Sequence, residues 1–172
     1  MADTPELPEA NDPFERAVAI SIAIMAVILS FIGNKGDNAK TDSILKTSQA
    51  SNHWAYFQSK SIKQSMRELE SDMITLNPGA APDAAAKKLA DLKSEIERYD
   101  GEKEKISAEA KDLTAQADIG SAINDKCDLS SLLLQIAVVI ASVSILTRWK
   151  AMWYASLALA AVGSYFGVMA FF

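Results

Sequence analysis

Three stretches without any charged side chain constrain this chain more than any other feature. They cover residues 17–34, 129–147 and 151–172, and are 18, 19 and 22 residues long. A helix needs about 20 residues to cross the apolar core of a bilayer, which is about 30 Å thick. A surface helix of a soluble protein is apolar on one face, not all round. The sequence therefore predicts three transmembrane helices, at Ala17–Gly33, 129–147 and 151–172.

Most of the charge lies between the first two of these stretches. Of the 39 charged side chains, 31 lie between Lys35 and Asp128, with 14 basic and 17 acidic residues interspersed. This mixture indicates a solvated helix surface, and it shows no basic face that would bind nucleic acid. Residues 1–16 contain five acids and three prolines, so we expect a disordered acidic tail. A cleavable signal peptide begins with basic residues. We therefore expect the first span to be retained as an anchor.

The segment between the first two spans, residues 34–128, is predicted to form a helical hairpin. The sequence from Gly33 to Asp37 is typical of a helix break. One arm is expected at about 41–76 and the other at about 84–118, with a Pro/Gly turn at 77–83 and Asp83 as an N-cap. The pattern leaves open whether the second arm continues through Gly120 into the second span.

Apolar residues in both arms recur at alternating steps of three and four. Such spacing places them on one helix face, as in the seam of a coiled coil. In the second arm these positions are Leu89, Leu92, Ile96, Tyr99, Lys103, Ile106, Ala110, Leu113, Ala117 and Gly120, where Lys103 interrupts the pattern. In the first arm they are Ile62, Met66, Leu69, Met73 and Leu76. The predicted fold is an all-α membrane protein with an antiparallel coiled-coil hairpin between its first and second spans.

Small residues form a stripe along each predicted span, and such stripes allow helices in lipid to approach closely. The stripes are Ala19, Ala23, Ala26, Ser30 and Gly33 in the first span, Ala137, Ala141 and Ser144 in the second, and Ser156, Ala160, Gly163 and Gly167 in the third. They could pack within one bundle or between subunits. Gln135 is the amide well inside a span, and we expect it to bridge helices by a hydrogen bond, with a pore-lining role as the alternative.

The basic turn Arg148-Trp149-Lys150 joins the second and third spans and is expected to anchor them at the lipid headgroups. By the positive-inside rule this turn is cytoplasmic, which places the hairpin on the far, periplasmic side. Three lysines that follow the first span, Lys35, Lys40 and Lys46, favour the opposite orientation. We favour the basic turn because it flanks two spans at once.

The sequence contains no arrangement of residues typical of a catalytic or metal site. His53 is the single histidine and Cys127 the single cysteine, whereas a zinc site needs three or four ligands. No phosphate-binding, metalloprotease or nucleophile-elbow motif occurs. We therefore expect no enzymatic activity, no metal and no cofactor.

The most unusual stretch is Ala50–Lys63, ASNHWAYFQSKSIK, where aromatic residues replace the heptad pattern. It is interpreted either as a core where the arms meet or as a contact site for a partner or neighbouring subunit. The candidate contact residues in it are Trp54, Tyr56, Phe57, Lys60 and Lys63.

This stretch resembles the motif ASxxWAYYQAKxI of the bacterial membrane family named domain of unknown function 4337. The segment Leu132–Trp153, LLLQIAVVIASVSILTRWKAMW, resembles the second span and basic turn of that family. The sequence departs from the family at Phe57, where Tyr is frequent, and at Trp149, where a second Arg is common. The resemblance extends from the first span to the last. It implies a bacterial inner-membrane protein and supplies no activity.

The function expected from these features is a non-enzymatic scaffold or an accessory subunit of a membrane complex. The expected partners are the lipid bilayer and either further copies of the chain or other subunits, with Gly163, Gly167 and Gln135 as candidate contacts within the membrane. The alternative is a small oligomeric pore or a stress-linked membrane effector, in which Gln135, Ser131, Ser142 and Ser144 would face a water-filled axis.

Overall fold

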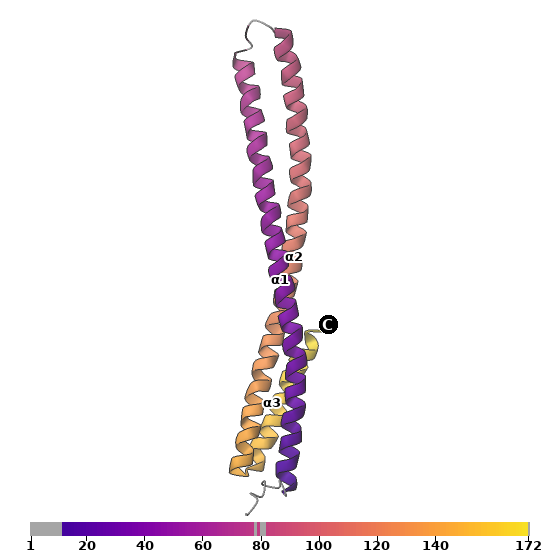
Figure 1. The fold of residues 1–172 in the computed structure, drawn as a ribbon, viewed down its shortest axis with the longest axis vertical. Helices are drawn as coiled ribbons and strands as arrows, with labels where there is room; N and C mark the ends of the chain where they lie inside the picture. Colours follow the sequence, from indigo (N-terminus) through magenta and orange to yellow (C-terminus); the bar gives the residue numbers. More distant parts are fainter. Residues whose placement is uncertain (1–11, 78, 80–81, 172) are drawn as a thin grey trace, which may run out of the picture. The chain divides into compact units, whose positions relative to one another are not determined.

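The computed structural model describes residues 12–77, 79 and 82–171, and all regular structure in this part of the chain is helical. Helix α1 covers Pro13–Leu76, α2 covers Pro82–Thr147 and α3 covers Lys150–Met169 (Figure 1). Each of the three is long and apolar enough to cross a membrane. The chain is therefore an all-helical protein of multi-pass membrane type. Most of the predicted tail, residues 1–11, lies outside the described residues.

The predicted break between Gly33 and Asp37 is wrong, because α1 continues through it without interruption. Gly36 is buried, and a Cβ atom added to it would lie 2.9 Å from Cβ of Cys127 on α2. Its missing side chain therefore allows α1 and α2 to approach closely. Packing at this point outweighs the roughly 1 kcal/mol by which glycine disfavours a helix.

The two ends of the predicted turn also differ in detail from the expectation. Helix α2 begins at Pro82, so Asp83 lies inside the first turn and is not the N-cap. Proline suits the first helical position because its fixed φ is helical and it lacks an N–H that would have no partner there. The carboxylate of Asp83 suits the positive end of the helix dipole. At its other end α2 continues through Gly120 into the second predicted span, which answers the question that the sequence left open.

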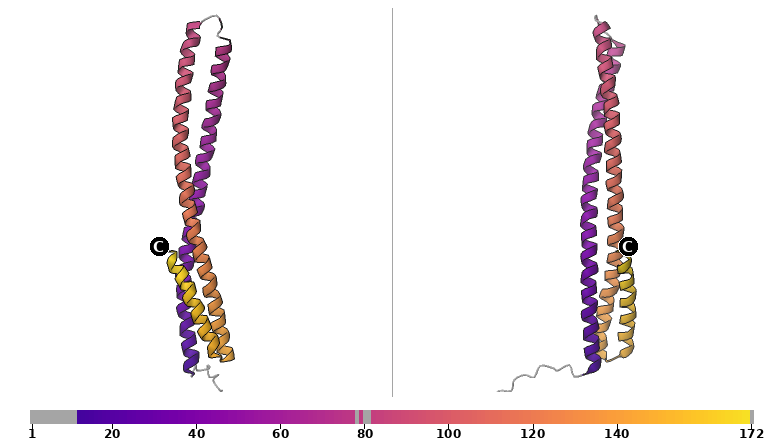
Figure 2. Two further views of the ribbon diagram at one scale, coloured as in Figure 1. Left: turned by 180° about the vertical axis from the view of Figure 1, so that it is seen from behind. Right: turned by 90° about the vertical axis from the view of Figure 1, so that its right-hand side faces the viewer.

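The chain divides into two compact units, which are described separately. The bundle unit comprises the described part of Met1–Thr41 together with Gly120–Phe172, and the arm unit comprises Asp42–Ile119. In the bundle unit, α3 lies beside the first part of α1 and the last part of α2 (Figure 2). Its core is built from all three helices and contains Met25, Ile32, Cys127, Leu134, Ala137, Ala160 and Ala170.

In the arm unit, segments of α1 and α2 lie side by side, and the contacts between them run in antiparallel order. The pairs are Ser43 with Ala117, His53 with Glu109, Lys60 with Glu102, Gln64 with Asp100, and Arg67 with Glu95. As the residue number rises on α1, it falls on α2. The positions predicted on α2 turn inward: Leu92, Tyr99, Ile106, Ala110, Ala117 and Gly120 are buried and the other four are half-buried.

The prediction for the facing side of α1 is wrong. Ile62, Met66, Leu69, Met73 and Leu76 are exposed in the arm unit, each by 62% or more. The side of α1 that faces α2 is buried or half-buried, and it contains Ala50, His53, Phe57, Lys60, Gln64 and Arg67. These residues are mostly polar because they pair with the acidic residues of α2. The arms are therefore joined by an apolar seam on α2 and a largely polar one on α1.

Candidate functional site

The centre of the aromatic stretch is a cluster around Lys60, which we call the Lys60 cluster: Tyr56, Phe57, Lys60, Tyr99 and Glu102. The ammonium group of Lys60 lies 2.6 Å from Oε2 of Glu102. It also lies 5.2 Å from the ring centre of Tyr56 and 5.3 Å from that of Tyr99. Aromatic rings attract cations through the negative charge on their faces. The cluster thus joins the arms through one cation held by a carboxylate and two rings.

Neighbouring residues extend this polar contact along the seam. Lys103 lies with its ammonium group 5.9 Å from the ring centre of Phe57 and 3.2 Å from Oδ1 of Asp100. Asp100 also accepts a hydrogen bond of 3.1 Å from Nε2 of Gln64. Gln64 is buried, and its amide nitrogen donates to Glu68 and Asp100, whereas its amide oxygen has no hydrogen-bond partner among the described residues.

The ion pair shifts the pKa of both of its members. The hydrogen bond with Glu102 raises the pKa of Lys60, and the hydrogen bond with Lys60 lowers the pKa of Glu102. A catalytic lysine needs a pKa lowered towards neutrality, and a general acid needs a carboxyl pKa raised towards it. Both shifts are in the opposite direction. Both shifts favour the charged forms of Lys60 and Glu102, which lie 2.6 Å apart.

The other candidate contact residues of the stretch lie around this cluster without joining it. Trp54 stacks edge to face on Phe57, with ring centres 5.6 Å apart. Its side chain is 36% exposed, and Lys63 is exposed as well. Tyr56, although it belongs to the cluster, is also exposed. His53 faces α2, where its Nδ1 lies 3.2 Å from Glu109. Among the residues described, no group of three or more His, Cys, Asp or Glu side chains could hold a metal ion.

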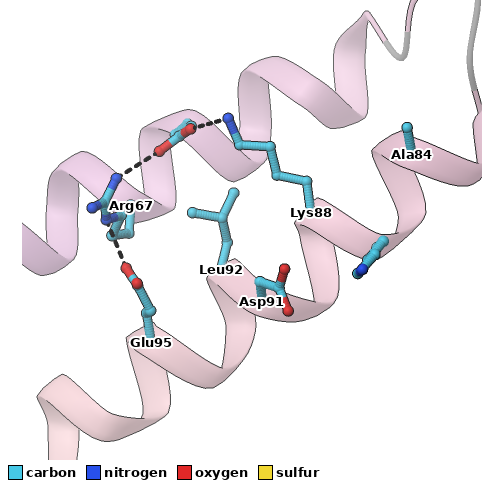
Figure 3. A pocket seen from close by; sticks show the side chains of 8 residues that line it. Arg67, Ala84, Lys88, Asp91, Leu92 and Glu95 are labelled. Carbon is cyan, nitrogen blue, oxygen red and sulfur yellow. Dashed lines mark hydrogen bonds and ion pairs between the residues drawn. The ribbon is translucent and has the colours of Figure 1, made fainter.

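A cavity of about 470 Å³ lies between the arms, near the end where α1 stops and α2 begins (Figure 3). Its lining residues are Arg67, Glu70, Ala84, Lys87, Lys88, Asp91, Leu92 and Glu95. Arg67 lies 2.9 Å from Glu70 and 2.8 Å from Glu95, and Lys88 lies 2.7 Å from Glu70. Three basic residues are matched by three acidic ones. The lining therefore has no net charge that would attract an ionic ligand.

In the bundle unit, both glycines of the third span contact other helices of the same chain. A Cβ atom on Gly163 would lie 3.1 Å from Cβ of Leu133, and one on Gly167 would lie 2.7 Å from Oγ of Ser130 and closer still to Ile32. The hydroxyl of Ser130 donates a hydrogen bond of 2.6 Å to the carbonyl oxygen of Gly163. These glycines therefore serve packing within one chain.

The three small-residue stripes face different ways. Those of the second and third spans are buried in the bundle at Ala137, Ala141, Ser144, Ser156, Ala160, Gly163 and Gly167. The stripe of the first span faces outward, because Ala19, Ala23, Ala26 and Ser30 are exposed and Gly33 is half-buried. Helix α1 instead turns Val18, Met25 and Ile32 inward.

Gln135 is exposed on α2 and forms no hydrogen bond with the described residues. The bridge between helices that we expected from it is made by Ser130. Ser142 is also exposed, and it lies seven residues after Gln135 on the same face, whereas Ser144 is buried on the opposite side. The four residues of the predicted pore axis therefore do not share one face of the bundle.

The basic turn lies beside the start of α1. A guanidinium nitrogen of Arg148 lies 3.4 Å from Glu15, and Arg148 itself has a positive φ of 51°. Trp149 precedes the first residue of α3, Lys150, and both are exposed. Trp153 packs edge to face on Phe14 and donates a hydrogen bond of 3.1 Å to Ser21. This end of the bundle unit thus combines basic and aromatic residues, as is usual at lipid headgroups.

Sequence reasoning missed several residues that build these contacts. Tyr99 was predicted only as a heptad position, and Ser130, Glu102 and Gln64 were not singled out. One signal could have found the polar seam: Ala50, His53, Phe57, Lys60, Gln64 and Arg67 alternate steps of three and four, as a buried face does. A search restricted to apolar residues overlooks such a face.

Comparison with known proteins identifies a family. A family model described as "Domain of unknown function (DUF4337)" matches residues 14–172, which is nearly the whole chain. No curated protein and no solved structure matches the chain.

Proposed function

We propose that this chain, which belongs to the DUF4337 family, is a non-enzymatic protein of the bacterial inner membrane that acts as a self-associating scaffold or as an accessory subunit of a membrane complex. The observation that carries the proposal is the outward direction of the small-residue stripe Ala19, Ala23, Ala26 and Ser30. Close approach between helices in lipid depends on small residues. Within residues 12–77, 79 and 82–171 no other helix covers this stripe, so it can contact a helix of another subunit.

The Lys60 cluster supports the same proposal. Its charges are matched, and their pKa shifts keep Lys60 cationic and Glu102 anionic. We therefore assign it to holding the two arms together as an antiparallel coiled-coil hairpin. In this role the arms present a rigid surface to other proteins.

We further propose that the arms lie on the periplasmic side, since the basic turn between α2 and α3 favours the cytoplasm. Cys127 is only 1% exposed and is a poor labelling site. A Cys127→Ser background with Ala108→Cys, an exposed position on α2, gives a better one. We expect a thiol reagent that cannot cross the inner membrane to label Ala108→Cys in intact cells. If Ala108→Cys is labelled only after the inner membrane is permeabilised, the arms lie on the cytoplasmic side and the proposed orientation is wrong.

Self-association is tested by enlarging the outward stripe. Ala23→Leu with Ala26→Leu should separate helices that meet there, and we expect at least a tenfold weaker association of the purified protein, or loss of a co-purifying subunit. Analytical ultracentrifugation in detergent, with mass spectrometry of co-purifying chains, provides the measurement. The matched control is Val27→Leu, which changes an exposed residue of the same span with little change of volume.

The outcomes separate the proposed roles. A stable monomer of the unchanged chain without any co-purifying protein contradicts both scaffold and accessory subunit. The pore alternative is favoured by one observation, the shared outward face of Gln135 and Ser142. It requires that reconstituted vesicles release a trapped ion and that Gln135→Leu abolishes this release, whereas the scaffold leaves the vesicles tight.

A further inference from the structure

One face of α1 in the arm unit is largely exposed among the residues that the structure describes. Ile62, Met66, Leu69, Met73 and Leu76 are exposed by 63%, 65%, 62%, 64% and 85% of their surface. We call these five residues the outer stripe. Steps of four, three, four and three separate them, so they form one line along the helix. Contiguous large apolar residues on a surface usually mark an interaction site.

The outer stripe points away from α2. Its positions correspond to a and d of a heptad, with Met66 and Met73 at a and with Ile62, Leu69 and Leu76 at d. The residues that contact α2, such as Lys60, Gln64 and Arg67, occupy positions b and f of the same heptads. On a helical wheel these two faces are about 150° apart, at 100° per residue. The arm therefore has one seam for α2 and a second seam that no other helix of the described residues covers.

The spacing and the flanking charges identify what fits this seam. A heptad line packs best against another helix, whose side chains fill the spaces between its own. The charged neighbours on the flanks are Lys63, Glu68, Glu70 and Asp72. This acidic balance does not suit an anionic lipid surface, which attracts clusters of lysine and arginine.

Within the arm unit, the other arm offers no comparable surface. Of the large apolar side chains exposed there, all lie on α1 except Ile119. The other exposed ones on α1 are Ile44, Leu45, Trp54 and Tyr56, and no two of them lie three or four residues apart. The surface of a second copy that matches the heptad spacing of the outer stripe is therefore its own outer stripe. Two copies inserted in one bilayer with the same topology leave it in the same direction along α1, and this makes the pair parallel.

We propose that the outer stripe is the contact between two copies of this chain, joined in parallel through α1. In this register Ile62 meets Ile62 of the second copy, and so on to Leu76. At the flanking positions, Ser65 of one copy faces Glu70 of the other, and Asp72 faces Asn77. Neither pair brings two like charges together. Five side chains from each copy bury on the order of 1,000 Å², the size at which specific interfaces begin. Confinement to one membrane raises the effective concentration of the second copy.

This inference rests on the proposed self-association and names a surface for it outside the predicted spans. It is tested by disulfide cross-linking of the full-length protein in native membranes, in a Cys127→Ser background. Ile62→Cys and Leu76→Cys, made separately, place a thiol at opposite ends of the stripe. In a parallel pair each faces its own counterpart, so we expect mild oxidation to convert at least half of each variant into a covalent dimer. Ala90→Cys, exposed on α2, is the control and should stay below a tenth.

The other occupants give different results. An antiparallel pair cross-links neither end variant with itself but joins Met66→Cys to Leu69→Cys when the two are co-expressed. A photoreactive amino acid in place of Met66 attaches to a second copy in the proposed pair, to lipid if the stripe lies on the bilayer, and to another protein if it binds a different partner. If the protein still self-associates while neither end variant cross-links, the proposed contact through the outer stripe is wrong, and the proposed scaffold function is not affected. If the protein is a monomer in every assay, both the outer-stripe contact and the proposed self-association are wrong.

Discussion

Replacing Gly167 by leucine is expected to destabilise the bundle unit by about 3 kcal/mol, near the upper end of the usual cost of overpacking. A side chain at this position would enter the space that Ile32 of α1 and the hydroxyl of Ser130 on α2 now occupy, since its Cβ alone would lie 2.7 Å from that hydroxyl. Helix α3 would have to move away from both neighbours. The hydrogen bond from Ser130 to Gly163 would be lost with it.

The same change at Gly33 provides the control for Gly167→Leu. A Cβ atom there meets nothing within 4 Å, so Gly33→Leu should change stability by no more than about 1 kcal/mol, and leucine is the better helix former. Unfolding of the purified protein by increasing fractions of a denaturing detergent, followed by tryptophan fluorescence, measures both. Equal effects at the two glycines would contradict the close packing of α3 described above.

The second large effect is expected at Ile106, which is 7% exposed in the seam between the arms. Ile106→Asp places a carboxylate there without a free partner, because the nearest lysine on the same helix face, Lys103, already lies 3.2 Å from Asp100. Burial of a polar group without a hydrogen bond costs roughly 1–3 kcal/mol in proteins, and a charge costs more. We expect a loss of about 3 kcal/mol and separation of the arms around the Lys60 cluster.

Hydrogen exchange detected by mass spectrometry follows this separation in the full-length protein. Peptides that cover residues 50–65 and 100–115 should exchange at least tenfold faster in Ile106→Asp than in the unchanged chain. Ala108→Asp adds the same group two residues away, on the exposed side of α2, and should leave the exchange as it was. If Ile106→Asp exchanges no faster than Ala108→Asp, the packing of the arms does not depend on this seam.

The three spans could be predicted from the sequence because charge is so costly in lipid. Residues 17–34, 129–147 and 151–172 contain no charged side chain, and three helices apolar enough to cross a membrane are found over these residues. Desolvation acts on each side chain by itself, so the pattern needs no knowledge of neighbours. The inward face of α2 could be predicted for a similar reason, since its apolar positions form a single line.

The continuity of α1 through the predicted break depended on tertiary contacts. The residues from Gly33 to Asp37 predict a break when they are taken alone. The helix continues through Gly36 because the backbone of this residue packs closely against Cys127 of α2. This contact joins residues that are 91 positions apart in the sequence. Local rules cannot include such a partner, and packing energy exceeds the small preference that they describe.

The sequence by itself determined which residues lie on a common face, and the tertiary structure decided what each face contacts. Three small-residue stripes look alike in the sequence, yet two are buried in the bundle and that of the first span faces outward. Helix α1 has two lines of heptad spacing, and the polar one faces α2 while the apolar one is exposed. Helical periodicity groups residues because it follows from backbone geometry. The choice between two faces depends on the side chains of the opposite helix, where Glu95, Asp100 and Glu102 provide partners for Arg67, Gln64 and Lys60.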